Sequence, residues 1–380
     1  MSEIEELGFD INTQKRAKEY GLHKRKLSLV ISTISFIAII MILEFGITTA
    51  LKAYVLQYTS DEWMVIALFM LIAYLAIWMI MLPLSFYEGF ILEHRYDLST
   101  QTMKSWVSDQ LKGFALSLVL ILGVIEVIYY LLREFPDVWW VIASVFMTVF
   151  SIIMAYVAPV LLMPIFFKFE PIEDDELRRR LLNLTEKADV NAVDVFRMKA
   201  GVKTKRAVGA LAGIGNTRRV ILSDTLLENY SSDEIEGVIG HEIGHHVYKH
   251  IGKRIVEGAM FMFLGLFLTG QLLIRTIGYF GFTEISDIAA LPLFGLILGL
   301  FFMVLSPIEN TISRRAEGHA DQYELDLVKK PDAFISSMIK LCDQNLRDAD
   351  PHPLIEFLFY DHPSGVKRVK RAIRFKGDTP

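Results

Sequence analysis

The sequence predicts a mainly α-helical, polytopic membrane protein with about six transmembrane helices and a small α+β domain at the cytoplasmic face. Hydrophobic residues make up 53% of the 380 residues, 26 of them Phe, and the mean hydropathy is +0.38. A soluble domain of ordinary composition is much less apolar. Six apolar runs approach the roughly 20 residues that a helix needs to cross a bilayer, and basic residues concentrate in the segments that these runs place on one side.

The chain begins with a charge-rich leader, residues 1–26, which precedes the first apolar run. That run is long and has no small-residue cleavage site, so we interpret it as a retained span and not as a signal peptide. The six runs cover about 27–49, 63–86, 111–132, 138–163, 255–274 and 288–307. Buried core helices of a soluble protein would have to reach this length six times by coincidence, which argues for membrane spans.

Basic residues predict how the spans are oriented. Those of the leader are Lys15, Arg16, Lys18, Lys24, Arg25 and Lys26, and by the positive-inside rule they place the N-terminus in the cytoplasm. Six crossings bring the tail, residues 308–380, to the same side, where the segment 164–254 also lies. Both are rich in Lys and Arg, whereas the loops 51–62 and 278–287 are poor in them. We therefore expect a multi-pass protein of the cell membrane with both termini and these two segments in the cytoplasm, divided at 1–26, 27–163, 164–254, 255–307 and 308–380.

The segment 164–254 has the pattern of a small mixed domain. Residues 174–188 have the spacing of an amphipathic helix, with Leu177, Leu181, Leu184 and Ala188 on one stripe. Residues 193–196 and 219–222 are typical of short strands, and residues 210–213 could form a third. An exposed edge strand of such a sheet can bind an extended peptide through main-chain hydrogen bonds.

The motif HEIGH, residues 241–245, follows these strands with a spacing that its chemistry explains. Residues four apart share one face of a helix, so His241 and His245 can hold one metal ion while Glu242 reaches a water molecule at that metal. A capping-box pattern at residues 231–234 and the helical spacing of the apolar residues after it predict that the motif is helical. The sequence therefore predicts a zinc hydrolase.

Two His residues and a water molecule leave zinc one protein ligand short. A metzincin would have its third His at position 251, which here is Ile251. His246 points about 100° away from His245, and His250 lies five residues past it, so both are more typical of surface or supporting residues than of ligands.

A more distant pair of acids offers the alternative. Glu317 and Asp321 follow the sixth span and lie four residues apart, so they share a helix face. One carboxylate could bind the metal, and the other could accept a proton from a ligating imidazole and fix its tautomer. Ordinary pairing with Arg314 or Arg315 at the membrane surface is the competing interpretation.

Three segments together are similar to a known family. HEIGHH (241–246) after a span-rich half, SRRAEGHAD (313–321) after the last span and YDHPSGVKR (360–368) near the C-terminus resemble the type I CaaX prenyl endopeptidases. These are the a-factor-converting integral-membrane zinc proteases of metallopeptidase family forty-eight. The segments 86–88, 94–112, 158–172 and 218–235 follow the same family's order and spacing.

The resemblance implies a fold in which the spans enclose a chamber beside a gluzincin-type zinc-protease domain, with one zinc ion per chain. It also implies a role for each matching residue: His241, His245 and Glu317 as metal ligands, Glu242 as general base, Asp321 as the acid that supports His241, and His362 with Arg368 as a pair facing the substrate or the oxyanion. The expected reaction is hydrolysis of a peptide bond in a prenylated or membrane-embedded protein at the lipid bilayer.

Two features depart from the family pattern. The family has an Asn-Ala dipeptide on the strand before the HExxH helix, and the matching positions here are Val208 and Gly209. A hydrogen bond to substrate or oxyanion is then absent, or it comes from Asn216 or the backbone. The chain also lacks the additional first span and the long insertion of eukaryotic members, so it looks like a prokaryotic member, whose substrate could be misfolded membrane protein, as for HtpX-like quality-control proteases.

Other classes of protein fit parts of the pattern. A catalytically inactive zinc-binding membrane scaffold or transporter would explain the spans but would have no need of Glu242. A site-two-type intramembrane protease carries HExxH within a span, whereas Lys249, His250, Lys253 and Arg254 are expected to close this helix at the membrane surface. A nucleic-acid partner is not expected, because no regular aromatic residues interleave the basic clusters. The single Cys342 excludes an intramolecular disulfide and a Cys-rich zinc site.

Overall fold

The computed structural model of the chain describes residues 3–190, 192–213 and 218–378. Six helical stretches within these residues are long and apolar enough to cross a membrane, as the sequence predicts. Their main helices are α2 (Ile11–Glu44), α4 (Glu62–Phe86), α6 (Met103–Glu134), α7 (Trp139–Val157), α12 (His250–Thr276) and α13 (Leu291–Val328). Most of them extend beyond the predicted apolar runs, because hydropathy marks only the apolar part of a helix that continues with polar residues.

Short polar side chains set where the membrane helices begin. Asp10 accepts a hydrogen bond from the backbone N–H of Thr13 at 2.6 Å, and Asp61 accepts one from that of Met64 at 2.9 Å. Such N-caps satisfy backbone groups that the first helical turn leaves free. The first predicted span, 27–49, is wrong at its end. Gly46 adopts a left-handed conformation, with φ of 62°, and separates α2 from α3 (Ile47–Val55).

Shorter helices connect and extend these spans. They are α1 (Glu3–Glu6), α5 (Glu93–Arg95), α8 (Met163–Phe166), α9 (Asp175–Lys187), α10 (Asp224–Asn229), α14 (Pro331–Gln344), α15 (Pro353–Phe359) and α16 (Gly365–Asp378). The described residues also include the π-helical segments η1 (Tyr87–Leu92) and η2 (Ala158–Leu162) and the 3-10 turns η4 (Ile277–Phe280) and η5 (Ile288–Ala290).

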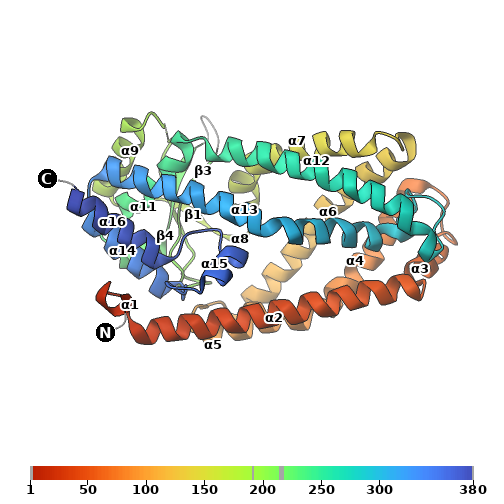
Figure 1. Cartoon of the computed structure of the whole chain (residues 1–380), viewed down its shortest axis with the longest axis horizontal. Coiled ribbons are helices and arrows are strands. Elements are labelled where there is room, and N and C mark those ends of the chain that lie inside the picture. The colour runs from red at the N-terminus through yellow and green to blue at the C-terminus, as the bar shows by residue number, and fades with distance from the viewer. Residues whose placement is uncertain (1–2, 191, 214–217, 379–380) are drawn as a thin grey trace.

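The spans form a closed ring. Helix α13 contacts α2 and α12, α12 contacts α7, α7 contacts α6, α6 contacts α4, and α3 joins α4 to α2. No more than 33% of the apolar window of any span is buried, so most of each span faces either lipid or the space inside the ring. The ring therefore encloses a chamber, and both chain ends lie at the end of the ring that holds the sheet (Figure 1).

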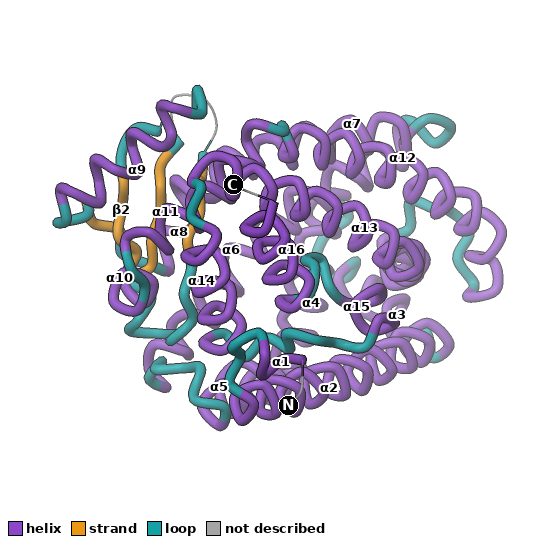
Figure 2. Tube along the Cα trace, turned by 60° about the vertical axis from the view of Figure 1, so that its left-hand side comes forward, coloured by secondary structure: helices purple, strands orange, loops and turns teal. Residues whose placement is uncertain are grey.

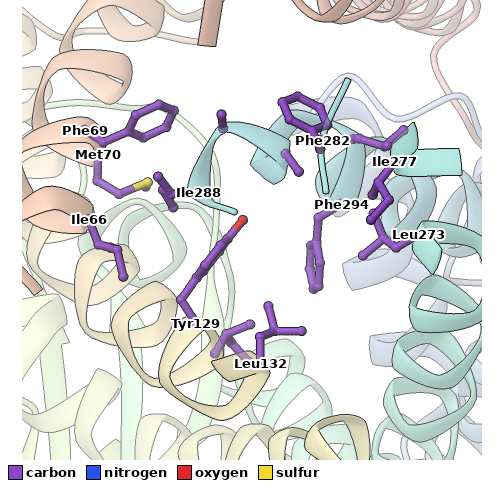
Figure 3. Close-up of a cluster of buried hydrophobic side chains, with 14 of the residues drawn as sticks. Ile66, Phe69, Met70, Tyr129, Leu132, Leu273, Ile277, Phe282, Ile288 and Phe294 are labelled. Atoms are coloured by element: carbon purple, nitrogen blue, oxygen red, sulfur yellow. The ribbon is translucent and has the colours of Figure 1, made fainter. Parts of the chain in front are cut away.

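An apolar cluster closes the opposite end of the ring. Phe69 from α4, Tyr129 from α6, Leu273 from α12 and Phe294 from α13 are buried in it, together with Phe282 from the loop after α12. Figure 3 shows these side chains converging from different helices. We refer to the buried residues of this cluster as the distal core.

A four-stranded sheet lies beside the membrane ring at the end that holds the termini (Figure 2). Its strands are β1 (Phe169–Pro171), β2 (Val195–Met198), β3 (Gly209–Ala212) and β4 (Arg219–Ser223), in the order β1-β2-β4-β3. Strands β2 and β4 are parallel and the other two pairs are antiparallel. Strand β3 is thus an edge strand, and it packs against the HExxH helix.

The predicted strands agree with the sheet except at its first half. The predicted strand 193–196 starts two residues before β2, although the main chain of Val193 and Asp194 already hydrogen-bonds to Arg218 and Val220. Strand β1 was not predicted. The amphipathic helix is confirmed as α9, whose Leu177, Leu181 and Leu184 are buried under the sheet domain.

The HExxH motif lies on α11 (Ser232–Val247), and the predicted capping box is present. Ser231 accepts from the N–H of Glu234, and the Glu234 side chain accepts from the N–H of Ser231 at 2.7 Å. The expectation that residues 249–254 close this helix is wrong. Lys249 adopts a left-handed conformation, with φ of 54°, and the chain changes direction there. Helix α11 therefore ends at Val247, and His250, Lys253 and Arg254 lie at the start of the membrane helix α12.

Candidate active site

Helices α11 and α13 pack side by side and bring three side chains to one point. The Nε2 atoms of His241 and His245 are 3.1 Å apart. The two oxygens of Glu317 lie 3.1 Å from His241 Nε2 and 3.4 Å from His245 Nε2. Gly244 permits this approach, since a Cβ there would lie 3.0 Å from the backbone of Ala320 on α13. A nitrogen from each imidazole and a carboxylate oxygen therefore face a common centre.

The other ring nitrogen of His241 is held by an ion-pair network. His241 Nδ1 donates to Asp321 Oδ1 at 3.0 Å. Asp321 is fully buried and also accepts from Arg368 Nε, 3.0 Å from both of its oxygens, and from Arg371 Nη1 at 2.8 Å. Gly318 leaves room for Arg371, because a Cβ there would meet its guanidinium at 2.9 Å. The network fixes the orientation of the His241 ring.

His245 has a different partner on its outer nitrogen. The left-handed turn at Lys249 brings His250 back over the end of α11, where its Nδ1 lies 3.0 Å from His245 Nδ1. His250 is 4% exposed and stacks near Tyr248 and His319. From the sequence, His250 could be either a surface residue or a residue that supports a ligand. Its burial and its contact with His245 favour a supporting role.

His246 points away from the other two imidazoles, as predicted, and contacts the edge strand. Its Nε2 donates to the carbonyl oxygen of Leu211 on β3 at 3.1 Å. Burial lowers the pKa of His246, which favours the neutral ring. The contact therefore ties the strand that precedes the motif to the motif helix itself.

The C-terminal loop brings His362 to the same centre. Arg314 on α13 donates to the carbonyls of Glu356 at 2.9 Å and Tyr360 at 2.5 Å, which fixes the loop between α15 and α16. His362 Nδ1 is 2.8 Å from Asp361 Oδ1, and its Nε2 lies 3.4 Å from Glu317 Oε2. Arg314 is therefore engaged with α15, which removes one of the arginines considered as partners of Glu317 and Asp321.

A cavity of about 490 Å³ opens beside this centre. Glu242, His241, His362 and Arg368 line it. Among the described residues no group hydrogen-bonds to Glu242, so its carboxylate is free to act on a molecule in the cavity. Arg368 is only 7% exposed, and its guanidinium is bound to Asp321. It therefore contributes to the cavity wall mainly as a buried residue.

Val208 and Gly209, which stand where the family has its Asn-Ala dipeptide, line another part of the cavity. Val208 is 39% exposed and lines the cavity, while its backbone N–H donates to Ser223 Oγ at 2.9 Å. Gly209 faces Val238 so closely that a Cβ there would be 2.6 Å from it. Asn216, considered as a substitute polar group, lies outside the described residues.

The donor set fits a metal ion. One ligand atom each from His241, His245 and Glu317 lie within 4.8 Å of one another, and two imidazoles with one carboxylate suit zinc. Burial alone would lower the pKa of His241, but the hydrogen bonds with Asp321 and Glu317 raise it, to about 10. The site thus favours a positive charge at this imidazole, where a metal cation would be equally favoured.

The fold and site define a class of protein: a multi-pass membrane protein in which an HExxH helix and a glutamate of a second helix meet beside a cavity, the arrangement of a metalloprotease. The chain belongs to peptidase family M48, whose model matches residues 171–375. A model described as "CAAX prenyl protease N-terminal, five membrane helices" matches residues 5–168. The chain is therefore a membrane metalloprotease.

Known proteins resemble the chain over most of its length. An uncharacterized metalloprotease, YhfN of Bacillus subtilis, is 27% identical over 94% of this chain and 84% of its own length. CAAX prenyl protease 1 of Saccharomyces cerevisiae is 29% identical over 76% of this chain and 67% of its own. The crystal structure of S. mikatae Ste24p has the same fold, with a TM-score of 0.86 at 24% identity over 98% of this chain and 91% of that one.

The structure brings together all seven residues that the sequence singled out, and it adds two. The predicted set is His241, Glu242, His245, Glu317, Asp321, His362 and Arg368. Arg371 and His250 were not assigned a place in it. Arg371 lies three residues after Arg368 on α16, so a helical reading of the tail could have found it. The contact of His250 depends on the left-handed turn at Lys249, which no local pattern predicts.

Proposed function

We propose that the chain hydrolyses peptide bonds of membrane-associated proteins with a zinc ion held by His241, His245 and Glu317. The observation that carries the proposal is the convergence of these three side chains beside a cavity that Glu242 lines. When bound there, zinc supplies Lewis acidity, which acidifies a water molecule and polarises a carbonyl group.

Glu242 is the general base in this proposal. It follows the first histidine directly, faces the cavity and has no competing hydrogen bond among the described residues. Its carboxylate would take a proton from the attacking water and pass it to the nitrogen of the leaving amine. The neutral amine could then depart.

His362 and Arg368 take separate roles in the proposal. Asp361 orients His362 so that its Nε2 faces the centre near Glu317, which suits a donor to the oxygen of the tetrahedral intermediate. The guanidinium of Arg368 is committed to Asp321, which supports a positioning role for Arg368 over direct contact with the oxyanion. Asp321 in turn would hold the His241 ring in the tautomer that leaves Nε2 free.

The substrate is proposed from the site and its relatives together. Edge strand β3 borders the cavity and could pair with an extended peptide. The yeast relative is named a CAAX prenyl protease, and the chamber of the fold could admit a lipid-modified or membrane-embedded chain. The basic leader and tail support a cytoplasmic site. The matches do not favour an HtpX-like quality-control protease or an inactive scaffold.

Glu242→Gln tests the proposal directly. The variant should bind as much zinc as the parent, measured by elemental analysis of the purified protein, because Glu242 is not among the proposed ligands. Its cleavage of a prenylated reporter peptide should fall by about 10²–10⁴-fold. Asp326→Asn, which removes an exposed carboxylate of α13 that does not line the cavity, is the matched control. Equal cleavage by parent and Glu242→Gln would exclude this mechanism.

A further inference from the structure

Helix α13 carries another acid to the cavity, one that the proposed mechanism does not use. Glu324 lies three residues beyond Asp321, lines the cavity and is 4% exposed. Among the described residues no group donates a hydrogen bond to its carboxyl. The residue lines the cavity, so a molecule that enters the cavity can hydrogen-bond to its carboxyl group.

The backbone of α11 is shaped to accommodate this carboxyl. A Cβ at Gly237 would lie 2.6 Å from Glu324 Oε1, and one at Gly240 would lie 3.5 Å from its Cγ. Any larger residue at Gly237 would displace the carboxyl. One ligand atom each of Glu324, His241 and Asp321 lie within 4.8 Å of one another. The acid therefore lies one helical turn before the HExxH motif, within reach of a side chain beside the scissile bond.

Part of the cavity wall is apolar. Val238 on α11 and Met338 and Leu341 on α14 line the same cavity. Ser337 also lines it, but its hydroxyl donates to the carbonyl of Phe334 at 2.9 Å and is not free for Glu324. The subsite thus combines apolar walls with a carboxyl group at one end.

A carboxylate at this position pairs best with a cation. Among its neighbours, Glu242 and Asp321 interact with Glu324 as negative charges, and His241 and Arg368 interact with it as positive ones. Both of these cations are already held by Asp321. Lysine and arginine match such a subsite, since each has a long apolar stem and a cationic tip.

We propose that Glu324 forms the base of a subsite that accepts a lysine or arginine side chain of the substrate next to the scissile bond. This inference rests on the proposed peptidase function and adds a sequence preference to it. The stem of the basic residue packs against Val238, Met338 and Leu341, and its tip pairs with the Glu324 carboxylate. A charge-assisted hydrogen bond of this kind should favour the basic residue by about tenfold or more in kcat/KM.

The test uses the detergent-solubilised, zinc-loaded full chain. Cleavage sites are first mapped by mass spectrometry in unfolded casein. A peptide spanning one site is then synthesised with Lys, acetyllysine or norleucine at each position flanking the cleaved bond in turn. At one position the parent should cleave the Lys peptide about tenfold faster than the acetyllysine and norleucine peptides. Equal rates at every position would overturn the proposal without any variant.

Two variants assign that preference to Glu324. Glu324→Gln should still cleave the norleucine peptide but lose most of the preference for Lys over acetyllysine, whereas Asp326→Asn on the exposed side of α13 should keep it. An unchanged preference in Glu324→Gln would also overturn the subsite. Zinc content and thermal stability of each variant separate this result from misfolding. Absence of cleavage by the parent, on casein and on the peptides alike, would count against the peptidase function itself.

Discussion

The distal core and the polar site between α11 and α13 are both buried, but they are held together by different physics. In the distal core, Phe69, Leu273 and Phe294 meet from separate helices with no requirement beyond shape. In the site, Asp321 is as deeply buried, yet it has a specific partner on each side in His241, Arg368 and Arg371.

The difference teaches what each region tolerates. Apolar side chains can be exchanged when volume is kept, because dispersion contacts have little directionality. When the partner of a buried charge is removed, the charge still lacks its hydration, and no ion pair offsets the free-energy cost of that loss. We therefore expect changes in the distal core to lower stability alone, and changes in the site to lower stability and metal binding together.

The largest effect should come from Asp321→Asn. Loss of the carboxylate leaves the buried Arg368 without its partner and the His241 ring without its acceptor. We expect a loss of about 4 kcal/mol in the free energy of unfolding and zinc binding at least tenfold weaker, measured by thermal unfolding and by chelator competition. An unchanged zinc affinity would contradict the expectation that changes in the site, unlike those in the distal core, lower stability and metal binding together.

Phe69→Ala is the corresponding change in the distal core. Phe69 is 1% exposed, so truncation leaves a cavity among α4 and its neighbours. The expected loss is near the lower end of the roughly 3–5 kcal/mol range for buried Phe, because burial from lipid adds little transfer free energy. Below the unfolding temperature, zinc affinity and peptide cleavage should equal those of the parent. A selective loss of zinc would mean that the two ends are coupled through the spans.

His250→Ala tests the contact that holds the second ligating imidazole, that of His245. His250 is the partner of His245 Nδ1 at 3.0 Å, so its removal should weaken zinc binding by about tenfold, less than the effect of Asp321→Asn, because no buried charge loses its partner. Gln at this position can restore a hydrogen bond, so His250→Gln should recover part of the affinity. The d–d spectrum of the cobalt-substituted protein should shift in His250→Ala. Affinity and spectrum equal to those of the parent would show that this contact does not orient His245.

The smallest effect concerns a surface ion-pair cluster at the start of α11. The hydrogen bond from Arg180 lowers the pKa of Glu236, and Lys330 lowers it further. A folded-state pKa below the ordinary value near 4.5 adds stability that is present above that value and is lost as the pH falls through the lowered pKa. Glu236→Gln should therefore narrow the difference in the free energy of unfolding between pH 7 and pH 3.5 by under about 1 kcal/mol, measured by thermal unfolding at the two pH values. An identical difference in parent and variant would show that the pair has no net effect.

Much of the fold and site follows from local pattern. Runs of apolar residues identified all six spans, because the bilayer imposes a minimum length of continuous hydrophobicity. The capping box and the HExxH spacing identified α11 and its ligand face, since both depend only on residues within one or two turns. The four-residue spacing of Glu317 and Asp321 indicated a shared face, but spacing alone could not choose between a metal site and surface pairing.

The errors in prediction have a common physical origin. The end of α11, the strand β1 and the contact of His250 all depend on backbone conformations or partners outside the local segment. Lys249 adopts a left-handed conformation, and β1 exists because it pairs with β2.

By itself, the sequence determined the membrane class, the number of spans and the chemistry offered by the motif helix, because these depend on composition and on periodicities of a few residues. Only the tertiary structure decided which distant groups meet: Glu317 with the two imidazoles, His362 beside Glu317, and Arg368 and Arg371 on Asp321. It also decided that Glu324 lines the cavity without a hydrogen-bond partner among the described residues. These contacts join residues up to 76 positions apart, and they depend on the glycine-lined packing of α11 against α13, which no short segment of the chain specifies alone.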